Sequence, residues 1–314
     1  MIYCVERIAG RRFPMTANQL STKKLRRILL AVTVLLLVLT AALTVLSFPH
    51  MIAGSTDDPA LQIASEPEEP PTETPVPPTE IPTEPTLPPP PPNPYDDLDF
   101  QYDGRFLKLI EGESIAGIDV SRWQYDIDWE KVARAGAEFA IIRVGYRGSE
   151  SGLINADAYA QQNLKGAAEA GLDIGVYFFS QALTREEAEE EAYYVLDIIK
   201  DHDITMPVVF DWERVRDEKS RSQNMDRRTL TDCAKTFLET VEMAGYNAMV
   251  YFNAHQSRNL YYLAELKQYD FWLASYTDRM DFPYKVDMWQ YTDTGKIPGI
   301  ETDCDFNVYF PSYG

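Results

Sequence analysis

From residue 114 onward, short apolar stretches alternate with longer amphipathic ones, and this alternation constrains the fold more than any other feature. The short stretches are rich in β-branched and aromatic residues, which predicts strands at 115–120, 139–144, 174–179, 207–210, 248–252, 271–275, 287–291 and 305–309. The longer stretches predict helices at 129–135, 156–170, 184–200, 226–244 and 255–266.

Alternating strands and helices imply a parallel sheet with helical crossovers, the organisation of the α/β class. Eight strands and about five helices fit a closed, irregular TIM-like β/α barrel better than an open doubly wound sheet, because helical patterns stop after residue 275. No glycine-rich phosphate loop follows the strand at 115–120, which argues against a nucleotide-binding Rossmann domain. We expect no cofactor.

The formal net charge of −20 is spread unevenly along the 314 residues. Residues 1–54 carry seven Lys or Arg against Glu6 alone, whereas residues 55–99 contain acidic residues and no basic ones. Residues 100–314 are net acidic. Phosphate binding needs a basic surplus, so we expect no nucleic-acid partner for the large domain.

Residues 28–48 form an apolar run without a charge. As a helix this run would reach ~30 Å, the thickness of a bilayer core. The basic residues lie immediately before it, in 1–27, so we expect a cytoplasmic N-terminal segment followed by a single transmembrane signal anchor. The alternative is a cleaved signal peptide, which the length of the run and the lack of a small-residue cleavage site disfavour.

Residues 49–110 are rich in Pro, Glu and Thr, and Pro88 to Pro92 form an unbroken proline run. Such a segment has too few apolar groups to build a core, so we expect a disordered extracellular linker on the order of 100 Å long. The large folded domain is expected at 111–314, outside the membrane of a Gram-positive-type cell surface.

Cysteine and histidine residues are few and give no metal-binding spacing. The cysteines are Cys4, Cys233 and Cys304, so at most one disulfide is possible within the large domain. We expect no structural or catalytic metal.

The strand that starts after Pro207 ends in two carboxylates, Asp211 and Glu213. Side chains alternate along a strand, so both carboxylates point to the same side while Trp212 points to the other. Each charge raises the cost of ionising its neighbour, and a neutral acid beside a carboxylate is what glycosidic bond cleavage needs. The alternative is a polar loop whose acidic pair is neutralised by Arg214 and Arg216.

Polar and aromatic residues follow the carboxyl ends of most expected strands, and in β/α barrels these ends meet on one rim. Carboxylates cut glycosidic bonds, aromatic rings stack on sugars, and amides bind hydroxyl and acetamido groups. The candidate catalytic residues are Asp119, Asp211, Glu213 and Asp305. The candidate substrate-binding residues are Tyr177, Asn253, Trp272, Tyr276, Trp289 and Gln290, although Tyr177 and Trp289 are equally explained as core aromatics.

Ordered motifs across about 115–310 resemble glycoside hydrolase family 25, the Chalaropsis-type lysozymes. The motifs are 117–124 (GIDVSRWQ), 127–129 (IDW), 174–179 (IGVYFF), 207–213 (PVVFDWE), 271–276 (FWLASY), 289–291 (WQY) and 305–307 (DFN). Arg122 stands where the family often has histidine, and Cys304 and Phe306 stand where it often has valine and leucine.

This resemblance implies a flattened β/α barrel that hydrolyses β-1,4 bonds between N-acetylmuramic acid and N-acetylglucosamine in peptidoglycan. It makes Glu213 the general acid/base and has Asp211 orient the acetamido group or stabilise positive charge. Asp119 and Asp305 would complete the acidic floor, with Tyr177 nearby. Two alternatives remain: a catalytically inactive barrel that binds peptidoglycan, and a chitinase-like hexosaminidase.

Overall fold

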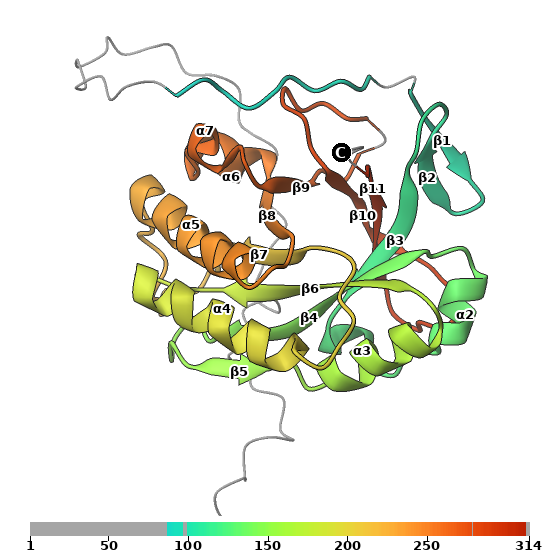
Figure 1. Ribbon diagram of the computed structural model, residues 1–314, viewed down its shortest axis with the longest axis horizontal. Helices are drawn as coiled ribbons and strands as arrows, with labels where there is room; N and C mark the ends of the chain where they lie inside the picture. The colour runs from blue at the N-terminus through green and yellow to red at the C-terminus, as the bar shows by residue number, and fades with distance from the viewer. Residues whose placement is uncertain (1–86, 97–98, 278, 312–314) are drawn as a thin grey trace, which may run out of the picture. The chain divides into compact units, whose positions relative to one another are not determined.

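A computed structural model describes residues 87–96, 99–277 and 279–311 (Figure 1). The expected cytoplasmic segment at 1–27, the transmembrane helix at 28–48 and the first part of the linker lie outside these ranges. Within them, the structure contains no helix that is both long enough and apolar enough to cross a membrane.

Eight strands close into a barrel, and a ninth short strand extends it. In order around the barrel, the strands are β3 (Ile115–Val120), β4 (Phe139–Arg147), β6 (Asp173–Ser180), β7 (Val208–Trp212), β8 (Ala248–Asn253), β9 (Asp270–Ala274), β10 (Met288–Gly295) and β11 (Cys304–Tyr309). The first seven of these run parallel, whereas β11 is antiparallel to both β10 and β3 and closes the barrel. Strand β5 (Ile154–Ala156) pairs antiparallel with the end of β4.

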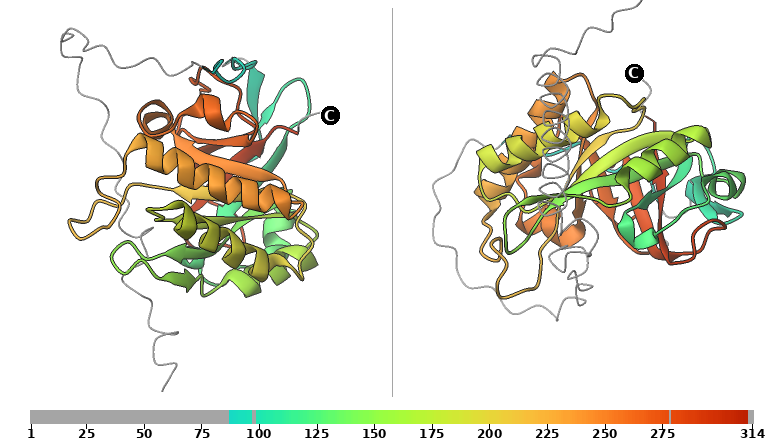
Figure 2. Two further views of the ribbon diagram at one scale, coloured as in Figure 1. Left: turned by 60° about the vertical axis from the view of Figure 1, so that its left-hand side comes forward. Right: turned by 90° about the horizontal axis from the view of Figure 1, so that it is seen from below.

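Helices cover only part of the barrel. They are α2 (Trp129–Arg134), α3 (Ala160–Glu169), α4 (Arg185–Ile199), α5 (Arg227–Met243), α6 (Ala254–Asn259) and α7 (Leu263–Leu266). Helices α3 and α4 pack on β4 and β6, and α5 packs on β7 and β8 (Figures 1 and 2). The TIM-like alternation of strand and helix therefore holds from β3 to β9 and ends there.

The barrel has an inner and an outer apolar layer, as strand alternation requires. Inward side chains such as Phe139, Ile141 and Trp272 fill the interior. Gly117 makes room for them, because a Cβ on this glycine would lie 2.5 Å from the ring of Phe139. Outward side chains form the larger layer under the helices, where Cys233 is buried as a free thiol.

Residues 100–109, which the sequence analysis placed in the linker, form the hairpin of β1 (Phe100–Asp103) and β2 (Phe106–Leu109). The hairpin packs against β3 and β11, above α2 in Figure 1. Phe106 is buried with its ring 4.9 Å from that of Phe306, and Phe100 lies 5.3 Å from the ring of Trp289. The segment therefore packs on the barrel through its aromatic rings, although its overall composition is polar.

The proline run also contacts the barrel. The backbone N–H of Lys285 donates to the carbonyl of Pro91 at 2.8 Å, and that of Asn93 donates to the carbonyl of Pro283 at 3.0 Å. Proline carbonyls remain acceptors even though proline lacks a donor, so the run can serve as a partner for a loop. The described chain is therefore tied to the barrel from its first residues.

Two expected helices differ from the prediction. The helix expected at 156–170 begins at Ala160, because residues up to 156 form β5. The helix expected at 255–266 is divided into α6 and α7. Between them, the carbonyl of Tyr261 accepts from the guanidinium of Arg227 at 2.6 Å instead of continuing the helical bonding. The described residues thus contain six α-helices rather than five.

Candidate active site

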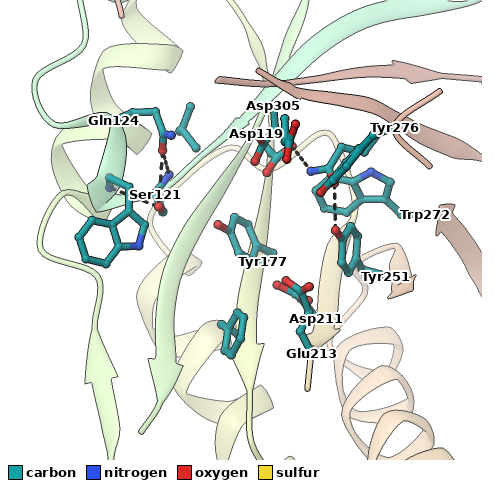
Figure 3. Close-up of a pocket in the computed structure, with 15 residues that line it drawn as sticks. Asp119, Ser121, Gln124, Tyr177, Asp211, Glu213, Tyr251, Trp272, Tyr276 and Asp305 are labelled. Carbon is teal, nitrogen blue, oxygen red and sulfur yellow. Dashed lines mark hydrogen bonds between the residues drawn. The ribbon is translucent and has the colours of Figure 1, made fainter. Parts of the chain in front are cut away.

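A cavity of about 250 Å³ opens at the carboxyl ends of the parallel strands (Figure 3). Carboxyl groups and aromatic rings dominate its lining. The lining residues are Asp119, Val120, Ser121, Trp123, Gln124, Tyr177, Phe179, Asp211, Glu213, Tyr251, Trp272, Tyr276, Gln290, Asp293 and Asp305.

Asp119 and Asp305 face each other across the antiparallel pair of β3 and β11. Oδ2 of Asp119 accepts from the side-chain amides of Gln290 and Asn307, both at 2.8 Å. A further side-chain hydrogen bond joins Asp119 to Asp305. Figure 3 shows the two carboxyl groups together at one end of the cavity.

The pKa of Asp305 is raised more than that of Asp119, so a proton held by this pair favours Asp305. Burial raises the pKa of Asp305 well above its ordinary value, and the charge of Asp119 raises that pKa further. Burial also raises the pKa of Asp119, but the three hydrogen bonds that it accepts oppose this change. Asp119 is therefore the carboxylate of the pair, and Asp305 is the acid that donates to it.

Asp211 and Glu213 project from the end of β7 on the same side, as their spacing predicts (Figure 3). Asp211 is 5 % exposed, and its Oδ1 has no hydrogen-bond partner among the described residues. Burial raises the pKa of Asp211 well above its ordinary value, the charges of Glu213 and Asp119 raise it further, and Arg143 partly opposes the change.

Aromatic and amide side chains form the wall between the two carboxyl pairs. The hydroxyls of Tyr251 and Tyr276 both donate to Oε1 of Gln290, at 2.9 and 3.0 Å. These bonds fix the orientation of the amide, so its NH₂ group points to Asp119. The indole of Trp272 donates to Asn307 at 2.9 Å and holds the second amide in the same way.

The sequence matches the model of one protein family. The model of glycosyl hydrolases family 25 matches residues 118–300, more than half of the sequence. The chain belongs to glycosyl hydrolases family 25. It is a glycoside hydrolase of that family.

Two curated proteins are similar in sequence to this chain. The chain is 29 % identical to the uncharacterised protein YegX of Escherichia coli K12 over 212 residues, covering 65 % of this chain and 72 % of YegX. It is 24 % identical to lysozyme M1 of Streptomyces globisporus over 225 residues, covering 66 % and 71 % of the two chains.

Solved structures of family members show the same fold. The autolysin LytC of Streptococcus pneumoniae, solved with a synthetic peptidoglycan ligand, aligns with a TM-score of 0.56 and 26 % identity. This alignment covers 65 % of this chain but only 48 % of LytC, so the chain matches about half of that protein. A family 25 hydrolase of Bacillus anthracis aligns with a TM-score of 0.53 and 24 % identity over 68 % of this chain and 95 % of that one.

Eight of the ten residues proposed from the sequence line the cavity of this family 25 barrel. They are Asp119, Tyr177, Asp211, Glu213, Trp272, Tyr276, Gln290 and Asp305.

Trp289 and Asn253 lie elsewhere. The indole of Trp289 is fully buried on the outer side of the barrel and donates to the carbonyl of Ser275 at 2.9 Å. Its neighbour Gln290 points inward, so strand alternation sends Trp289 outward. Asn253 caps α6, and its side chain accepts from the N–H of Gln256 at 2.9 Å. Neither residue lines the cavity, so the prediction that they bind substrate has no support from their positions.

Sequence reasoning missed three residues that shape the site. Tyr251 and Asn307 each lie two positions from a residue already singled out, Asn253 and Asp305, so strand periodicity would have indicated both. Arg143 had no such signal. It is fully buried on β4 and forms an ion pair with Asp157 at 2.7 Å, a partner that lies beyond the end of its strand.

No group of three or more His, Cys, Asp or Glu residues in the described part of the chain is placed to hold a metal ion. Carboxyl groups are the reactive groups that the cavity offers. They support acid–base and electrostatic chemistry at a glycosidic bond.

Proposed function

We propose that this family 25 glycoside hydrolase is a lysozyme that cleaves the β-1,4 bond between N-acetylmuramic acid and N-acetylglucosamine in peptidoglycan. The observation that carries the proposal is the meeting of two carboxyl pairs, Asp119 with Asp305 and Asp211 with Glu213, with aromatic rings in one cavity. The similarity to lysozyme M1 and to an autolysin solved with a peptidoglycan ligand supports the choice of substrate.

Glu213 is the general acid in this proposal. Its carboxyl group is only partly buried at the cavity wall, whereas Asp211 behind it is almost inaccessible. The leaving oxygen of the sugar therefore reaches Glu213 first. A bound glycan would displace water from Glu213, and this desolvation favours the protonated form that an acid needs.

Asp211 orients the substrate or stabilises the positive charge that develops on the sugar ring. Its Oδ1 is buried next to the cavity without a partner among the described residues, so it has an open position for an acetamido N–H. The Asp119 carboxylate lies at the other end of the cavity and adds a fixed negative charge. Fixed charges in a site shielded from water stabilise an oxocarbenium-like transition state.

The N-terminal segments would hold the enzyme at its substrate. We propose that residues 28–48 anchor the chain in the cell membrane with the catalytic domain outside, and that the proline-rich linker spans the gap to the wall. The basic residues before the apolar run and the acidic, proline-rich composition after it support this arrangement. A tethered enzyme gains a high effective concentration at a polymer that it reaches.

Replacing Glu213 with glutamine tests the assignment. In the full-length chain, Glu213→Gln keeps the shape of the side chain and removes its proton, so turnover of purified peptidoglycan should fall at least ~10²-fold. Binding to peptidoglycan should persist. The matched control is Glu218→Gln, an exposed position on the same loop, which should retain full turnover.

Two results would contradict the proposal. Turnover by Glu213→Gln within a few-fold of the wild type would move the acid to another carboxyl group. A wild-type chain that binds peptidoglycan without cutting it would favour the inactive, wall-binding alternative.

A further inference from the structure

The backbone that carries Glu213 lies where the sheet ends. Strand β7 pairs with β6 as far as Ser180 opposite Trp212, and with β8 as far as Asp211 opposite Tyr251. Residues 213–217 have no regular secondary structure. The carbonyl of Trp212 therefore comes after the last residue paired with β8, and the carbonyl of Glu213 comes after the last residue paired with β6.

On the β6 side, the side chain of Gln181 holds the carbonyl of Glu213 in place of a strand. It follows β6 directly and is fully buried. Its side-chain amide donates to the carbonyl of Glu213 at 2.9 Å and to that of Ser180 at 2.7 Å. Its Oε1 accepts from the hydroxyl of Ser222 at 2.5 Å, which fixes the orientation of the amide and ties down the loop after Glu213.

On the β8 side, the side chain of Gln256 holds the carbonyl of Trp212 in place of a strand. It lies in the first turn of α6, is 3 % exposed, and its amide donates to the carbonyl of Trp212 at 2.7 Å. Its Oε1 accepts from the backbone N–H of Asn253 at 2.7 Å as part of a capping box. The cap formed by Asn253 thus orients the glutamine that reaches β7.

The two carbonyls belong to the peptide groups on either side of the Glu213 Cα atom. Because peptide groups are planar, fixing both of them sets the direction in which the Glu213 side chain leaves the backbone. We infer that Gln181 and Gln256 are positioning residues that aim the acid at the glycosidic oxygen. This inference rests on the proposed role of Glu213, and neither glutamine lines the cavity or needs to touch substrate.

The test compares substrates that need the acid with substrates that do not. A phenyl glycoside of the disaccharide N-acetylglucosaminyl-N-acetylmuramic acid has a poor leaving group and requires protonation, whereas a dinitrophenyl glycoside departs without it. In the full-length chain, Gln181→Met and Gln256→Met preserve side-chain volume and remove the amide. We expect kcat on the phenyl substrate to fall ~10-fold or more, because a displacement of about 1 Å can cost ~10²-fold. KM and the rate on the dinitrophenyl substrate should stay within ~3-fold of wild type.

Gln223→Met is the matched control, since Gln223 is exposed in the same loop and donates to the carbonyl of Asp217 instead. It should leave both rates unchanged. Ser222→Ala is a milder second variant: loss of the hydroxyl that orients Gln181 should lower the phenyl rate selectively, by ~3-fold.

Equal losses of rate on both substrates would show that the glutamines only maintain the fold. Unchanged rates on both substrates would show that they do not position Glu213. Either result would overturn the inference. A wild-type chain that cuts neither substrate would instead contradict the proposed function, so the two failures are distinguishable. If one methionine variant does not fold, the other two variants still decide, because each perturbs one of the two peptide groups that flank the Glu213 Cα atom.

Discussion

The assignment of the carboxylate in the Asp119 and Asp305 pair leads to a measurable asymmetry in stability. Asp119→Ala removes the acceptor of the Gln290 and Asn307 amides, whose bonds to it are both 2.8 Å long. These two amides are 3 % and 0 % exposed, so they lose a partner in a buried environment. Each unsatisfied donor costs about 1–3 kcal/mol, and water entering from the cavity offsets part of this. We expect the free energy of unfolding to fall by about 2–4 kcal/mol.

Asp305→Asn is the matched variant. Asp305 acts as the donor to Asp119, and an asparagine NH₂ group can donate in its place. The free energy of unfolding should therefore change by less than about 1 kcal/mol. Urea denaturation of the full-length chain at neutral pH, followed by tryptophan fluorescence, measures both variants. If Asp119→Ala were no less stable than Asp305→Asn, Asp119 would not be the hydrogen-bonded carboxylate of the pair.

Three further predictions follow from the same residues and segments. If the substrate's own acetamido group is the nucleophile and Asp211 orients it, Asp211→Asn should be inhibited poorly by a thiazoline analogue of the sugar that inhibits the wild type well. A covalent ester trapped on Asp211 by a fluorinated sugar would refute this mechanism. Burial raises the pKa of Asp270 from 3.8 to about 6, so its contribution to stability is present below pH 3.8 and lost as the pH rises through 6. The free energy of unfolding of Asp270→Asn, relative to wild type, should therefore be about 2 kcal/mol higher at pH 7 than at pH 4, and an equal difference at both pH values would contradict this. Protease added outside intact cells should release a fragment that begins within residues 55–99, and a domain protected until lysis would refute the expected topology.

Strand periodicity accounts for most of what the sequence predicted correctly. The eight barrel strands lie where short apolar runs predicted them, because a parallel strand that is buried on both faces is apolar along most of its length. The same periodicity brings Asp211 and Glu213 into one cavity. Applied strictly, it would also have placed Trp289 outside the barrel.

The features that the sequence did not predict depend on contacts between distant segments. The hairpin at 100–109 is held by rings that pack against Trp289 and Phe306, and nothing local in the proline-rich segment indicates these partners. The ion pair of Arg143 with Asp157 likewise depends on how the chain turns after β4. The direction of β11 is set by closure of the barrel, which no single segment specifies.

The identity of the sugar at the newly formed reducing end tests the central claim most directly. Peptidoglycan digested with the full-length chain is reduced with borohydride, and the released fragments are analysed by mass spectrometry, with Glu213→Gln as the inactive control. The account predicts reduced N-acetylmuramic acid in the wild-type digest and none above background with the variant. Reduced N-acetylglucosamine at the new ends, or equal release by the variant, would contradict it.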